Sequence, residues 1–328
     1  MNDRGRRGPV SIACVLVAVF LALAGCSPRP DLSGRVQEIS DVLSALPGVD
    51  DVDHYYQNQE EQLGFDGARQ LYFEVRIASE ASDDEIIGVA STFISEVADA
   101  FDDYDRELVL RMPDFTVDIN GTPDPDRLRQ RLSGMKEQSP ILAAETFKWG
   151  VRNDDDSGDV LTIGDTSATP DAVLTAARSL VGSEQVMVKA SPRGGARWEV
   201  RFPYSAEAQN RLFAALGQGV PDGVDMIAIS DDQVEYVSVS LDSGTDATMR
   251  LKTVIDTIAA GTPPPWTLSW RVPEAKPNPH NLATGSTVSV GGCEYNPVAD
   301  HASDPAEHFT PDAIAVRDEL RAQYDTCV

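Results

Sequence analysis

Apolar and polar residues alternate with a period of two in several stretches, which is the pattern of a strand with one buried face. The alternation is clear at residues 71–77, 198–202 and 268–272. Between residues 108 and 119 the apolar positions change from even to odd numbers at Pro113. Because such a change reverses the buried face, we expect a bulge or a break in the strand at that proline.

Between the strands, apolar residues recur three or four positions apart, which predicts amphipathic helices. The helix expected over residues 82–102 has Ser82 as its N-cap and three acidic residues in its first turn. Four further N-cap residues precede helical stretches: Thr169, Ser205, Thr245 and Thr310. Three glycines are expected to close helices in the left-handed conformation: Gly182, Gly217 and Gly261.

The order of these elements indicates the fold class. Residues 196–272 are predicted to run βαββαβ, which is the order of a split-βαβ unit, and residues 107–190 give the same order less clearly. Strands with one polar face indicate sheets that helices cover on one side only. We therefore predict an α+β fold of tandem split-βαβ (ferredoxin-like) units, with helices on one face of antiparallel sheets and a short C-terminal helical tail.

Changes in composition divide the chain into segments. The first α+β unit is expected over residues 33–138, and the second α+β region over residues 139–272. After Val272 the chain becomes rich in proline and glycine, so residues 273–328 are predicted to be a linker and a clipped C-terminal tail.

The N-terminal residues resemble the signal sequence of bacterial lipoproteins. Three arginines precede an uncharged apolar stretch at residues 10–24, which ends in the lipobox-like sequence Leu23-Ala24-Gly25-Cys26. The resemblance implies that residues 1–25 are a signal peptide and that Cys26 carries a diacylglyceryl group. Residues 26–32 would then be a short lipidated tether, and the protein would sit on the extracytoplasmic face of the cell membrane. The excess of arginine over lysine resembles that of high-GC actinobacteria.

The charge of the chain narrows the range of partners. Acidic residues outnumber basic residues by 53 to 27 among 328 residues, and the formal net charge is −26. A sequence-independent nucleic-acid binder needs a basic surface, so we expect no nucleic-acid partner. An anionic bilayer repels such a body, so we expect attachment to the membrane through the N-terminal lipid.

Two groups of residues have the composition of a metal site. The first contains His301, Asp304 and His308 with two neighbouring acidic residues, and zinc accepts such a mixture of ligands. The second, at residues 153–159, resembles a calcium loop but has Gly164 where the bidentate glutamate is required. An exposed acidic loop and a polar hairpin turn are the alternatives. We predict that neither group is a metal site and expect no cofactor.

Other candidate chemistry is sparse. The chain has four histidines and contains neither a Gly-x-Ser-x-Gly elbow nor a His-Glu-x-x-His motif. Two interpretations are open for Asp50, Asp51, Asp53 and His54: they form an acid/base group, or they belong to a solvated turn. Two aromatic pairs either line a ligand pocket or belong to the core: Tyr55 with Tyr56, and Trp266 with Trp270.

Cys293 and Cys327 are the cysteines left once the signal peptide is removed and Cys26 is lipidated. Outside the membrane disulfides persist, and a tail with little core gains most from a covalent link. We therefore predict a Cys293–Cys327 disulfide. It would enclose 35 residues and contribute about 3–4 kcal/mol to stability.

Three classes of function are compatible with these patterns. We expect a non-enzymatic binding module that contacts another envelope protein or a cell-wall component, because no Ser/Cys/His constellation is evident. The first alternative is a carrier of a small molecule or lipid. The second is a metal-assisted envelope enzyme, which depends on residues 300–308.

Overall fold

The fold comes from a computed structural model of the chain. It is described for residues 31–58, 69–98, 100–152, 158–217, 219–242, 244, 246–272, 282–293 and 305–326. The predicted signal peptide and Cys26 lie outside these residues. No helix in the described part of the chain is long and apolar enough to cross a membrane.

One helix followed by two strands is the pattern that recurs along the described chain. The helices are α2 (Ser33–Ser44), α3 (Asp83–Val97), α4 (Pro125–Leu142), α5 (Pro170–Val181), α6 (Ala206–Leu216), α7 (Ala247–Gly261) and α8 (Pro311–Tyr324). The strands are β1 (Val49–Asn58), β2 (Arg69–Ile77), β3 (Asp105–Arg111), β4 (Thr116–Asn120), β5 (Ala144–Arg152), β6 (Asp159–Thr166), β7 (Val186–Pro192), β8 (Arg197–Phe202), β9 (Val224–Ser230), β10 (Gln233–Ser240), β11 (Trp266–Arg271) and β12 (Ser286–Val290).

All twelve strands form one sheet, and their order in space is their order along the chain. Antiparallel pairs within a hairpin, such as β1–β2, alternate with parallel pairs whose strands are joined by a helix, such as β2–β3. Each helix–hairpin unit therefore adds two strands to the edge of the preceding unit.

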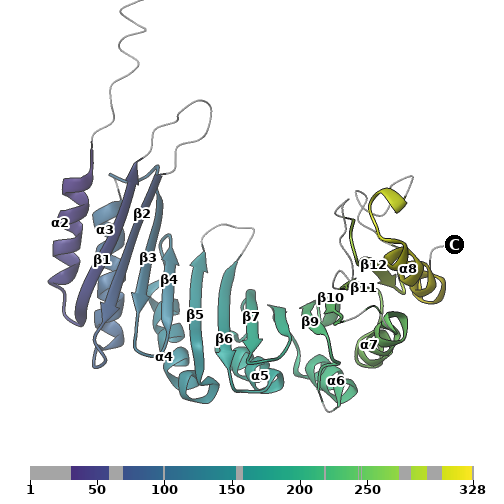
Figure 1. Cartoon of the computed structure of the whole chain (residues 1–328). Coiled ribbons are helices and arrows are strands. Elements are labelled where there is room, and N and C mark those ends of the chain that lie inside the picture. Colours follow the sequence, from purple (N-terminus) through teal and green to yellow (C-terminus); the bar gives the residue numbers. More distant parts are fainter. Residues whose placement is uncertain are drawn as a thin grey trace, which may run out of the picture.

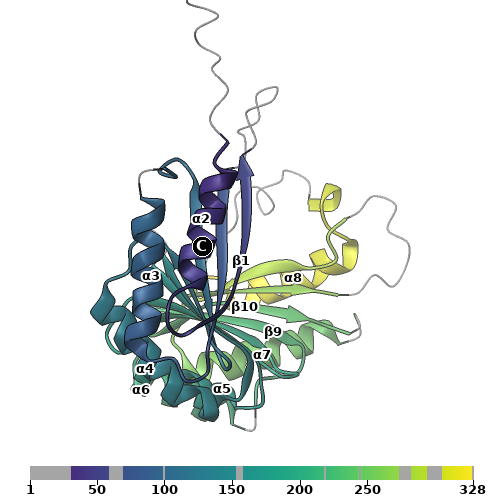
Figure 2. The same cartoon turned by 90° about the vertical axis from the view of Figure 1, so that its left-hand side faces the viewer.

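The helices lie in one layer on one face of the sheet, and no described helix covers the other face (Figures 1 and 2). Each helix packs against the next, from α2 against α3 through to α7 against α8. The strands fan out as the sheet twists, as strands of L-amino acids do (Figure 2).

The hydrophobic core lies between the helix layer and the sheet. Alternate residues of every central strand are buried there, and Trp149 and Trp198 are among the largest side chains that are fully buried. Leu320 of α8 joins the same cluster, so the core extends to the C-terminal helix.

The prediction of tandem ferredoxin-like units is wrong. In a split-βαβ unit a further strand separates the two parallel strands that a helix connects. Here the connected strands are direct neighbours: β8 pairs with β9 at Arg197 and Met226, and β10 pairs with β11 at Val237 and Leu268. The result is one mixed sheet of twelve strands.

The sheet also runs through the boundary expected at residues 138–139, because β4 pairs with β5 at Thr116 and Lys148. The division into domains itself stays a prediction. Within the segment expected to be a linker and tail, β12 pairs with β11, and α8 packs on β12. The sequence pattern does not predict β12, because its five residues include two apolar side chains, Val288 and Val290, and these are too few to show an alternation.

Several local predictions are confirmed. Ser82 begins α3 with a capping box, in which its side chain accepts from the backbone of Glu85 and its own backbone donates to the Glu85 carboxylate. Thr169, Ser205 and Thr310 cap their helices in the predicted way, although Thr245 lies outside the described residues. The chain breaks at Pro113, where a turn separates β3 from β4.

Gly261 does not have the predicted left-handed conformation. Gly182 and Gly217 have φ values of 59° and 57°, but Gly261 is the last residue of α7 and does not have a positive φ. A Cβ at this position would lie 2.8 Å from Cα of Leu212 and 2.9 Å from Cβ of Ala215. The glycine is therefore required for the close packing of α7 against α6.

Candidate functional site

One face of the sheet is not covered by any described helix, and we call it the open face (Figures 1 and 2). Its side chains occupy the polar positions of the alternating pattern, and most are half-buried or exposed. They include Tyr72, Glu74 and Arg76 (β2), Val109 and Arg111 (β3), Thr116 and Asp118 (β4), Lys148 and Gly150 (β5), Val160 and Thr162 (β6), Met187 and Lys189 (β7), Glu199 and Arg201 (β8), Met226 and Ala228 (β9), Tyr236 and Ser238 (β10), and Thr267 and Ser269 (β11).

Ion pairs between strands hold the acidic side of the open face in place. Arg111 donates from Nε and Nη2 to the two carboxylate oxygens of Glu74, at 2.7 and 2.9 Å. These hydrogen bonds lower the pKa of Glu74, although partial burial opposes the shift. Lys148 forms an ion pair with Asp118 on the neighbouring strand. These ion pairs therefore hold the side chains in fixed positions across neighbouring strands.

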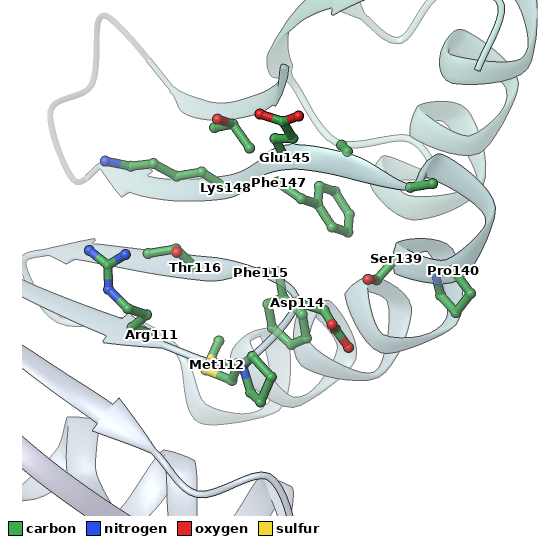
Figure 3. Close-up of a pocket in the computed structure, with 14 residues that line it drawn as sticks. Arg111, Met112, Asp114, Phe115, Thr116, Ser139, Pro140, Glu145, Phe147 and Lys148 are labelled. Atoms are coloured by element: carbon green, nitrogen blue, oxygen red, sulfur yellow. The ribbon is translucent and has the colours of Figure 1, made fainter. Parts of the chain in front are cut away.

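A cleft of about 620 Å³ opens at the rim of this face, between the β3–β4 turn and the start of β5 (Figure 3). The cleft exists because β4 and β5 pair only from Thr116 and Lys148 onward, and the chain segments before these residues diverge. Phe115 and Phe147 meet edge to face in it, with ring centroids 6.3 Å apart. Figure 3 shows Arg111, Thr116 and Lys148 on one side of the cleft.

Polar groups make up most of the cleft lining. Ser139, from the end of α4, and Thr146 add hydroxyl groups, and Asp114 and Glu145 add carboxylates. Among the described residues, no histidine lines the cleft. Such a lining can hydrogen-bond a polar group of a ligand.

Two further clefts continue along the same rim. One, of about 630 Å³, lies where β8 and β9 begin to pair, which is the equivalent place two helix–hairpin units further along. Arg193 lines this second cleft and forms ion pairs with Asp165 and with Glu145 of the first, at 2.8 and 2.7 Å. The third, of about 350 Å³, lies on the open face over β8–β11. The rim is therefore a row of linked polar hollows.

The predicted metal-ligand candidates are not brought together by anything the structure describes. His301 and Asp304 lie outside the described residues, and His308 is exposed just before α8. Among the described residues no three His, Cys, Asp or Glu side chains are grouped as metal ligands. The expectation that residues 300–308 hold no metal stays a prediction.

Of the second metal candidate, residues 153–157 lie outside the described residues, but Asp159 is buried in a different setting. Its carboxylate accepts a hydrogen bond from Nε1 of Trp149 at 2.9 Å and forms an ion pair with buried Arg131 of α4. The guanidinium of Arg131 lies 4.7 Å from the centroid of the Trp149 ring and 3.0 Å from Glu184. Asp159 therefore belongs to a buried ion-pair network that joins α4 to the sheet.

The acid/base candidates at the start of β1 do not converge. Asp51 forms an ion pair with Arg76 at 3.2 Å. Asp53 is paired with Glu74 on the open face, whereas His54 lies on the other side of the strand, 5.7 Å from the ring of Phe73.

The two aromatic pairs differ in their surroundings. Trp266 and Trp270 are each only 3% exposed, so they belong to the core. Tyr56 stacks on Tyr104, with ring centroids 5.8 Å apart, whereas Tyr55 is 51% exposed. Neither pair lines a described cleft apart from Trp270, which borders the third one.

Of the two cysteines predicted to form a disulfide, Cys293 is exposed after β12 and is disulfide-bonded. Cys327 lies outside the described residues, so the pairing of Cys293 with Cys327 stays a prediction. The residues that precede the two cysteines are in contact, because the amide of Thr326 donates to the carbonyl of Gly292 at 3.1 Å.

Apart from Asp51 and Asp53 on β1 and Trp270 at the third cleft, the residues of the rim and of the open face are not among the candidates that the sequence pattern predicts. Their signal is present as charged residues at the polar positions of the alternating strands, but it does not tell which strands are neighbours. Comparison with protein-family models, with curated proteins and with solved structures finds no match to this chain.

Proposed function

We propose that this protein is a lipid-anchored binding module of the cell envelope, with no enzymatic activity, that docks another envelope protein on its open face. The lipobox-like sequence at Cys26 supports the anchor, and the acidic body keeps the folded part away from an anionic bilayer. The protein would act on the extracytoplasmic side of the membrane.

The observation that carries the proposal is the open face itself. At a strand spacing of about 4.8 Å, twelve strands span roughly 50 Å across, which is enough for a standard interface of about 800 Å² per partner. Apolar side chains such as Val160, Met187 and Tyr236 lie among the charged ones on this face. That mixture is typical of non-obligate protein interfaces.

The two alternatives have less support in the described residues. A lipid carrier needs a largely apolar cavity that buries its ligand, whereas the three rim clefts are open and lined mostly by polar residues. An enzyme of the hydrolase type needs a nucleophile next to a base. The described histidines, His54 and His308, lie outside all three clefts.

Site-specific photo-crosslinking in the cells that make the protein tests the proposal. A photoreactive amino acid replaces Thr162 or Ser269 on the open face, and Ser179 on the outer side of α5 is the matched control position. We expect the same envelope protein to crosslink from both open-face positions and not from Ser179. That protein, once purified, should bind the purified wild-type protein directly.

Three results would contradict the proposal. They are crosslinks from Ser179 alone, crosslinks to a cell-wall polymer in place of a protein, and the absence of any crosslink from the open face. The anchor is tested separately: Cys26→Ala should move the protein out of the membrane fraction or leave it unprocessed. A normally processed, membrane-bound Cys26→Ala variant would refute the lipoprotein assignment.

A further inference from the structure

Two cations lie next to each other in the middle of the open face. In the register of β7 and β8, Lys189 lies opposite Glu199 and Met187 lies opposite Arg201. Lys189 and Arg201 are therefore diagonal neighbours on adjacent strands. Diagonal neighbours of an antiparallel pair have Cα atoms about 7 Å apart. Both side chains are exposed. Their charged ends can therefore reach the same group on a partner.

Neither cation has a partner within the described part of the chain, and this distinguishes them from the others. The remaining arginines and lysines with described side chains form ion pairs or hydrogen bonds, as Arg197 does with Glu199 at 3.3 Å. Acidic residues outnumber basic ones by 53 to 27, so a surface cation in this chain usually finds a carboxylate. Lys189 and Arg201 are neighbouring cations that do not form an ion pair with a described carboxylate. Another molecule can therefore supply the negative charge at this place.

The surroundings of the two cations suit a polypeptide. Thr162 lies beside Lys189 on β6 and offers a hydroxyl, and Val160 lies beside Met187 and adds apolar surface. Gly150 lies beside Val160 on β5, and an added Cβ there would meet nothing closer than 3.7 Å. A glycine on an accessible strand lets another chain approach the sheet closely.

We propose that Lys189 and Arg201 form the contact point for an acidic segment of the partner protein, whose carboxylates pair with both side chains while its apolar residues lie on Val160 and Met187. This inference rests on the proposed docking function and names the chemistry of the partner. The Arg201 guanidinium can hold one carboxylate through two hydrogen bonds, and the Lys189 ammonium can hold a second.

A carboxylate-bearing protein fits better than an anionic membrane or polymer. Glu199 lies opposite Lys189 in the strand register, and the chain carries a net charge of −26, so a uniformly negative surface would be repelled. A protein segment can place its carboxylates at the two cations and avoid Glu199. It can also use the apolar side chains beside the cations, which a phosphate-rich surface cannot.

Fluorescence anisotropy with a labelled peptide probe tests the inference. The probe is a twelve-residue peptide of alternating glutamate and serine, and the same peptide with glutamine in place of glutamate is its uncharged counterpart. At low ionic strength we expect wild-type protein to bind the acidic probe and not the uncharged one. The double variant Lys189→Gln/Arg201→Gln should bind about tenfold more weakly, because two charge pairs are lost.

The matched control is Arg211→Gln/Lys252→Gln, which removes the same charge from α6 and α7 in the helix layer. It should bind the acidic probe as the wild type does, and thermal unfolding should confirm that both double variants are folded. Absence of binding by the wild type, or equal weakening in both double variants, would overturn the inference. The inference would also be overturned if the wild type bound phosphatidylglycerol vesicles and not the peptide, and if the Lys189→Gln/Arg201→Gln variant lost this vesicle binding.

Photo-crosslinking separates this inference from the docking function. If the crosslink from Thr162 persists at full yield in the Lys189→Gln/Arg201→Gln variant, the open face still docks a partner but not through these cations. If the wild-type protein gives no crosslink from the open face, the docking function itself fails. A crosslink that is lost in this variant and kept in the Arg211→Gln/Lys252→Gln control supports both.

Discussion

Replacement of Asp159 by alanine should destabilise the protein more than almost any other polar substitution in the sheet. The side chains of Asp159 and Arg131 are only 2% and 4% exposed, and they form a direct ion pair. The same carboxylate accepts the indole N–H of Trp149 at 2.9 Å. Asp159→Ala therefore leaves a buried guanidinium with less negative charge around it and a buried N–H donor without this acceptor.

The magnitude follows from these two losses. Removal of one partner from a buried ion pair costs about 3–5 kcal/mol, and here the lower end applies because Glu184 remains 3.0 Å from Arg131. An unsatisfied buried N–H costs about 1–3 kcal/mol more. We expect a loss of about 4 kcal/mol for Asp159→Ala. Asp159→Asn keeps an acceptor for Trp149 and should lose about 1–2 kcal/mol less.

Urea denaturation at pH 7, followed by tryptophan fluorescence, measures both variants. We expect the midpoint to fall in the order wild type, Asp159→Asn, Asp159→Ala, with the slope m unchanged. The double variant Arg131→Met/Asp159→Asn should be more stable than Asp159→Ala, because it removes the buried charge altogether. If Asp159→Ala lies within about 0.5 kcal/mol of the wild type, the network does not stabilise the fold and the reasoning is refuted.

Three other predictions concern the C-terminal part of the sheet and its helices. If Cys293 and Cys327 are joined, neither should react with an alkylating agent before reduction, and reduction should lower stability by up to about 3–4 kcal/mol; alkylation of both without reductant would contradict the pairing. Burial raises the pKa of Asp325 to about 6, although a backbone hydrogen bond from Ser289 opposes it. Since this pKa exceeds the ordinary value of 3.8, the associated stability is present below pH 4 and is lost as the pH rises through 6. The hydrogen-exchange protection factors of α8, which are corrected for the intrinsic pH dependence of amide exchange, should therefore fall between pH 4 and 7 in the wild type and stay flat in Asp325→Asn. Equal profiles would refute the assignment. Gly261→Ala should lower stability by about 1–2 kcal/mol because the added methyl group overpacks against α6. Gly88→Ala, on an open part of α3, should raise stability slightly. Thermal unfolding measures both variants, and a stabilised Gly261→Ala would contradict the packing argument.

Most elements of the fold could be predicted from the sequence because their signals are local. The alternation at residues 71–77 reflects the two faces of β2, and the capping box at Ser82 and Glu85 satisfies amides in the first turn of α3. The signal at Pro113 is also local. The change of buried face there predicts a bulge or a break, and the structure has a break, with a turn between β3 and β4.

The candidate site could be predicted only in part. The polar positions of β7 and β8 follow from alternation, so Lys189 and Arg201 belong to an accessible face on sequence grounds. Their closeness, however, depends on the register that pairs Met187 with Arg201. A shift of that register would separate the two cations without any change in the alternating pattern.

By itself, the sequence determined the periodicity of most elements, most helix starts and the acidic charge of the body. Only the tertiary structure decided that the strands follow one another in a single sheet, and hence that the polar faces of twelve strands join into one open face. The reason is that alternation specifies which side of a strand is buried, whereas strand order depends on contacts between distant residues. One such contact is the approach of Gly261 in α7 to Leu212 in α6, which sets adjacent units side by side and which no local pattern encodes.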